Sequence, residues 1–109
     1  IPHQGNAFEV INETASSLSI NAKATNIHTS DIFYRKDAGI PAVAEKYNCL
    51  AVEMEAFALF ANAKYLGKNA ATILTVSDVI PTHEQISADE RERALKPMIE
   101  LALESAIKL

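Results

Sequence analysis

The order of structural elements is clearest between residues 49 and 78, where the sequence reads CLAVEMEAFALFANAKYLGKNAATILTVSD. The apolar run Cys49–Val52 has the length and the polar flanks of a buried strand. A nearly all-apolar helix is predicted next, over Glu55–Leu66, and Gly67 follows it as a typical C-terminal residue. Ala70–Val76 is predicted to be a second buried strand. Strand, helix and strand in this order predict parallel strands joined by a crossover, and therefore an α/β fold.

Weaker patterns lie on either side of this stretch. Those on the N-terminal side predict a helix, a strand and a short helix, in this order: Phe8–Leu18, Ala22–Thr29 and Ile40–Tyr47. On the C-terminal side, Ser77–Ile86 is expected to be a polar loop. Ser87–Glu90 then match a capping box, which begins a helix running toward Leu109. Pro97 should kink this helix or split it in two.

Composition limits the class of protein. A chain of 109 residues is enough for one small domain, and residues 1–109 are expected to form it. Ten Lys and Arg residues against fourteen Asp and Glu residues give a net charge of −4, which argues against a nucleic-acid partner. No apolar run approaches the ~20 residues of a membrane span, so no membrane partner is expected. The single cysteine, Cys49, excludes an internal disulfide and favours a reducing compartment such as the cytoplasm.

Two carboxylates flank Met54 where the strand beginning at Cys49 runs into the following helix. They belong to Glu53 and Glu55, and an ionised carboxylate is costly to bury without partners. One interpretation is that such a carboxylate accepts paired hydrogen bonds from the vicinal hydroxyls of a polyhydroxyl ligand. The other is a charge at a helix start, stabilised by the helix dipole. The spacing leaves both interpretations open.

A third acid, Asp78, stands just past the predicted strand Ala70–Val76. Sites in parallel sheets gather at the carboxyl ends of strands, so Ser77 and Asp78 are expected beside Met54 and Glu55. An Asp in this place acts as a general acid if its pKa is raised; the alternative is a loop cap. Arg91, near the start of the last helix, belongs either to a solvated face or to a helix end that folds back onto Asp78.

Other residue types offer less. The three histidines lack the paired spacing of metal ligands, so no metal site is expected. Phe33 and Tyr34 either stack on a planar ligand or cover the edge of a core. There is no glycine-rich phosphate loop, and no cofactor is expected.

Read together, several segments resemble one family, the hexameric bacterial type of purine nucleoside phosphorylase. The most specific of them are Val52–Ala56, Thr75–Asp78, and Thr82–Gln85 with Ala88 and Glu90–Arg91. Ser30–Tyr34 and Met98–Ser105 fit the same pattern. The resemblance implies a three-layer fold in which helices flank a mixed or parallel sheet. Members of the family are much longer than this chain, which is similar to their C-terminal half only.

The resemblance implies an activity, the phosphorolysis of purine (deoxy)ribonucleosides to free base and (deoxy)ribose 1-phosphate, in purine salvage. The glycosidic bond breaks through an oxocarbenium-like state, and the purine leaves more easily when its N7 is protonated. By analogy Asp78 is the proton donor and Arg91 closes onto it. The resemblance gives the remaining residues to the nucleoside: Glu55 to the ribose hydroxyls, Met54 to the sugar, Glu53 and Ser77 to the border of the site, and Phe33 and Val52 to the base.

Partners and alternatives follow from the same resemblance. Purine nucleoside and inorganic phosphate are the expected small molecules, and a homo-oligomer, the family's hexamer, is the expected assembly. The family's phosphate site belongs to the half that this chain does not match. A nucleosidase acting on methylthioadenosine or S-adenosylhomocysteine is one alternative, although Thr82–Gln85 argues against it. Another is a catalytically incomplete piece that only binds nucleoside or assembles.

Overall fold

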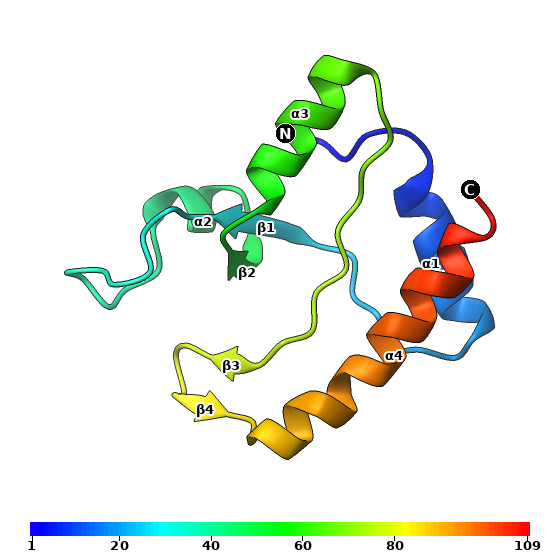
Figure 1. Ribbon diagram of the computed structural model, residues 1–109. Helices are drawn as coiled ribbons and strands as arrows, with labels where there is room; N and C mark the ends of the chain where they lie inside the picture. Colours follow the sequence, from blue (N-terminus) through cyan, green and yellow to red (C-terminus); the bar gives the residue numbers. More distant parts are fainter. The chain divides into compact units, whose positions relative to one another are not determined.

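The computed structural model in Figure 1 describes residues 1–109. The chain forms two compact units, each built from segments that are separated in sequence. The first unit, here unit 1, contains Ile1–Gly5 and Lys23–Ala70, and unit 2 contains Asn6–Ala22 and Ala71–Leu109. Helices combine with a parallel and an antiparallel strand pair, which confirms the expected α/β class. The assignment of the whole chain to a single domain stays a prediction.

Unit 1 is built around a parallel pair of strands. Its elements are β1 (Asn26–Thr29), α2 (Ala42–Lys46), β2 (Cys49–Glu53) and α3 (Ala56–Leu66). The register sets His28 opposite Val52 and Thr29 opposite Glu53, and the crossover between the strands carries α2, which contacts β2. The buried apolar residues of this unit are all alanines: Ala44, Ala56, Ala63 and Ala70. Strand β1 begins four residues later than predicted.

Gly67 ends α3 as the sequence predicts. Its φ of 63° lies in the left-handed region, where a side chain meets steric resistance. This conformation lets the Lys68 amide donate to the Ala63 carbonyl at 2.8 Å, so that the last turn keeps a partner for its carbonyl group. The helix therefore stops at a residue whose backbone geometry suits glycine best.

Replacing Gly67 by Ala is expected to lower the free energy of unfolding by about 1 kcal/mol. An added Cβ meets no atom within 4 Å, so the cost is confined to the backbone conformation. Urea unfolding of Gly67→Ala and Gly39→Ala measures it, because Gly39 also has open space around it but no positive φ. Equal stability of the two variants would contradict the assignment.

The predicted strand over Ala70–Val76 is wrong. Only Ala70 is paired, in an antiparallel bridge with Gln4 whose N···O distances are 2.9 and 3.0 Å. Residues 71–76 form no backbone hydrogen bond. An apolar run signals burial and extended backbone, but a strand also requires a neighbour that pairs with its amide and carbonyl groups. No segment of this chain supplies that neighbour.

Unit 2 is held together by a pair of helices that lie side by side in Figure 1, α1 (Ala7–Ser17) and α4 (Ala88–Ala106). Thr14 of α1 is fully buried and Leu101 of α4 is 2% exposed. The Lys108 ammonium donates to the Thr14 hydroxyl at 3.0 Å, which gives that buried hydroxyl a partner. The core of unit 2 therefore lies along the contact between these helices.

Helix α4 begins at the predicted capping box. The Ser87 hydroxyl accepts from the Glu90 amide at 3.1 Å, and the Glu90 carboxylate accepts from the Ser87 amide at 2.8 Å. Pro97 does not split the helix, which continues to Ala106. A proline in a helix interior removes one backbone bond at a cost of about 3 kcal/mol. The capped start of α4 and its packing on α1 offset that cost.

The segment predicted as a polar loop contains a short antiparallel hairpin. Its strands are β3 (Asp78–Val79) and β4 (Glu84–Gln85), with Asp78 opposite Gln85. The Ile86 amide extends the ladder by donating to the Ser77 carbonyl at 3.1 Å.

No helix in either unit has both the length and the apolar character needed to cross a bilayer.

Candidate functional site

The turn from β2 into α3 is fixed by the side chain of Glu53. One carboxylate oxygen, Oε2, accepts from the backbone amides of Glu55 at 2.7 Å and of Ala56 at 2.6 Å. The other oxygen, Oε1, accepts from the Thr29 hydroxyl. The first amides of a helix have no partner within the helix, and here a carboxylate supplies one. Glu53 is thus bonded to the protein through both of its oxygens.

These contacts also change the acidity of Glu53. Partial burial by itself would raise the pKa of its carboxyl group. Hydrogen bonds from Thr29 and from the amides of Glu55 and Ala56, with the nearby His28, stabilise the charged form and hold the pKa below its usual value. The carboxylate is therefore ionised at neutral pH, where it is complementary to the positive end of the helix dipole.

This lowered pKa predicts a pH dependence for Glu53→Gln. Because the folded pKa lies below the unfolded value of about 4.3, the stabilisation is complete above pH ~4.3 and is lost as the pH falls through the folded pKa. The variant should therefore lower the free energy of unfolding by about 1–2 kcal/mol at pH 7, and by less at pH 3.

Urea unfolding of wild type and variant at both pH values measures this difference. Glu45→Gln is the control, since Glu45 is exposed in the same unit and its side chain makes no hydrogen bond. A deficit in Glu53→Gln that is the same at both pH values would contradict the role of the charge.

Glu55, two residues further on, is in the opposite situation. It is the N-cap residue of α3, but its side chain makes no capping hydrogen bond. The carboxylate is exposed and has no hydrogen-bond or ion-pair partner in the protein. Met54, between the two acids, is 39% exposed. The turn therefore presents one free carboxylate beside a flexible apolar side chain.

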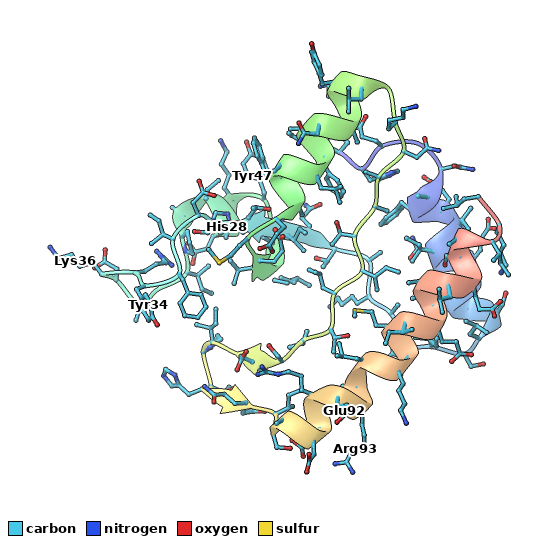
Figure 2. The ribbon with its side chains drawn as sticks, in the orientation of Figure 1. His28, Tyr34, Lys36, Tyr47, Glu92 and Arg93 are labelled. Carbon is cyan, nitrogen blue, oxygen red and sulfur yellow. The ribbon has the colours of Figure 1, made fainter.

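Val52 and Phe33, the two residues predicted to flank the base, belong to the same unit as this turn. Val52 lies on β2 and is about half exposed, while Phe33 follows β1 and is 76% exposed. Phe33 packs edge-to-face on Tyr34, with ring centroids 5.0 Å apart. Figure 2 shows Tyr34 and Lys36 on the loop that leads away from β1 and α2. Both predicted base-flanking side chains thus have free apolar surface.

Unit 2 carries the remaining predicted site residues, Ser77, Asp78 and Arg91. The Ser77 hydroxyl donates to Oδ2 of Asp78 at 2.6 Å. Both residues line a small cavity of about 110 Å³ in the hairpin, together with Val76, Val79, Glu84, Gln85 and Ile86. Asp78 itself is exposed, so its carboxyl group is accessible beside a mostly apolar wall.

Arg91 lies on the first turns of α4, in the same unit as Asp78. It is exposed and forms no ion pair with Asp78 in this structure. Figure 2 shows its neighbours Glu92 and Arg93 on the same part of the helix. The closure of Arg91 onto Asp78 stays a prediction, and so does the approach of Asp78 to Glu55.

One residue that contacts the β2–α3 turn was missed by the sequence analysis. Thr29 was read only as the end of a predicted strand, yet its hydroxyl contacts both Glu53 and α3. The register of two parallel strands would have revealed it, because Thr29 lies directly opposite Glu53.

No group of three or more His, Cys, Asp or Glu side chains is placed to hold a metal ion.

A comparison with known protein families gives a match. The family described as the phosphorylase superfamily matches residues 6–107, which is nearly the whole chain and includes both groups of site residues. The parallel strands with their helices are consistent with a fold of the nucleoside phosphorylase type. The match supports membership of this superfamily and nucleoside phosphorylase activity in general. The chain therefore belongs to the phosphorylase superfamily, the superfamily of the nucleoside phosphorylases.

Proposed function

We propose that this protein acts in the phosphorolysis of purine (deoxy)ribonucleosides, with inorganic phosphate as co-substrate and no cofactor. The observation that carries the proposal is the contrast between two carboxylates of one turn. Glu53 is bonded to the protein through both oxygens, whereas Glu55 keeps both of its oxygens free. A free, exposed carboxylate at this place is suited to accept hydrogen bonds from vicinal hydroxyls of a ribose.

The reaction breaks the bond between C1′ and the purine nitrogen and forms a bond between C1′ and a phosphate oxygen. Asp78 donates its proton to N7 of the purine, so that the base leaves as a neutral molecule. Ser77, which donates to Oδ2 of Asp78, orients the carboxyl group for this transfer. Arg91 approaches Asp78 when the site closes and favours delivery of the proton.

The nucleoside is held by residues of unit 1. Glu55 binds the 2′- and 3′-hydroxyls and Met54 packs against the sugar. Phe33 and Val52, whose apolar surfaces are exposed, flank the base. Glu53 of the same unit and Ser77 of unit 2 border the nucleoside. A hexameric assembly, which rests on the resemblance to the bacterial enzymes, belongs to the same proposal. So does a cytoplasmic location, which rests on the single cysteine.

Base release from inosine, with and without inorganic phosphate, tests the proposal. Uridine and methylthioadenosine are the comparison substrates. Hypoxanthine release that depends on phosphate and exceeds uracil release from uridine supports purine phosphorolysis. Release without phosphate, with methylthioadenosine preferred, would instead indicate a hydrolytic nucleosidase. A folded chain that binds inosine without releasing base would leave only the nucleoside-binding role.

A further inference from the structure

Thr29 joins three parts of unit 1 through one hydroxyl group. It is the last residue of β1 and lies opposite Glu53 in the parallel register. Its hydroxyl donates to Oε1 of Glu53 and accepts from the backbone amide of Phe57 at 3.1 Å. A single side chain thus connects the end of β1, the carboxylate in the β2–α3 turn and the first turn of α3.

The backbone supports the same connection. The Ser30 amide donates to the Glu53 carbonyl at 2.9 Å, which holds the end of β1 against the end of β2. With Thr29 engaged at Oε1, only Oε2 of Glu53 remains for the amides of Glu55 and Ala56. The orientation of the Glu53 carboxylate, and with it the backbone that carries Glu55, therefore depends on the Thr29 hydroxyl.

We propose that Thr29 is a positioning residue for the sugar-binding carboxylate of Glu55, acting through Glu53 and the first amides of α3. This inference rests on the proposed function, since it assumes that Glu55 binds the ribose hydroxyls. Thr29 does not touch the nucleoside. It fixes the turn in which Glu55 projects, since both carboxylate oxygens of Glu53 accept hydrogen bonds from Thr29 and from the amides of this turn.

The test compares Thr29→Val and Thr29→Ser in the full chain. Valine has nearly the shape of threonine but makes neither hydrogen bond, whereas serine retains both. Thr25→Val is the matched control, because the Thr25 hydroxyl is exposed and bonds only to the carbonyl of the next residue. Circular dichroism establishes that each variant is folded.

The readout is the preference for inosine over 2′,3′-dideoxyinosine, measured as a ratio of dissociation constants by calorimetry. Thr29→Val should lower this preference about tenfold, the effect of misplacing about one charge-assisted hydrogen bond. Thr29→Ser and Thr25→Val should keep the preference of the wild type. A general loss of stability would weaken the binding of both ligands alike and would leave the ratio of their dissociation constants unchanged.

Two results would overturn the inference while the proposed function stands: an unchanged preference in Thr29→Val, or rapid hydrogen exchange of the Phe57 amide in the wild type. The exchange measurement needs no variant and therefore decides even if Thr29→Val does not fold. Slow exchange that persists in Thr29→Ser supports the inference. A wild type that does not distinguish inosine from its dideoxy analogue overturns the assignment of Glu55, and this inference with it.

Discussion

Replacing Asp78 by Asn is expected to lower phosphate-dependent base release from inosine by about 10²–10⁴-fold, the usual range for loss of a general acid. Asparagine retains the size of the side chain and can still accept from the Ser77 hydroxyl, as Asp78 does at 2.6 Å. It has no proton to transfer to N7, so the purine must leave as an anion. Hypoxanthine release, followed by its absorbance, measures the rate.

The chemistry supplies a control for this prediction within the substrate. In 7-methylinosine the base already carries the positive charge that protonation would supply, so Asp78→Asn should cleave it at nearly the wild-type rate. Asp37→Asn is the protein control, since Asp37 is exposed in the loop before α2. Full turnover of inosine by Asp78→Asn would show that the acid role is wrong.

The parts of the fold that could be predicted from the sequence are those determined by local chemistry. The capping box at Ser87 and the terminal Gly67 are set by residues a few positions apart, and both are found where expected. The strand predicted over Ala70–Val76 is not formed, because a strand needs a neighbouring strand to pair with and no local pattern encodes that partner. Pro97 was predicted to kink or split the last helix, and it does not split it, because the capping and packing that keep α4 continuous involve residues far from Pro97.

The candidate site shows the same division. The sequence marked Glu53 and Glu55 as unusual acids and left two interpretations open for such a position: a ligand-binding carboxylate and a charge at a helix start. Glu53 is the charge at a helix start, because its carboxylate accepts hydrogen bonds from the amides of Glu55 and Ala56. The Glu55 side chain makes no such bond. Thr29 escaped notice because its role depends on strand register, which pairs residues 24 positions apart.

Replacing Glu55 by Gln is expected to raise KM for inosine and to lower kcat, with a loss in kcat/KM of about 10- to 100-fold. A neutral amide forms weaker hydrogen bonds to the ribose hydroxyls, and hydrogen bonds to a charged group contribute about 1.5–3 kcal/mol. The amide also stabilises the oxocarbenium-like state less than a carboxylate does, which accounts for the fall in kcat. Initial rates at several inosine concentrations measure both constants.

Glu53→Gln is the decisive comparison for Glu55→Gln, because the two acids lie two residues apart in the same turn. Loss of the Glu55 charge should leave the free energy of unfolding unchanged, since no protein group bonds to that carboxylate. Loss of the Glu53 charge should lower it, because three protein donors then lose their ionised partner. Unchanged kinetics in Glu55→Gln, or a loss of stability equal to that of Glu53→Gln, would remove Glu55 from the site and make both acids structural.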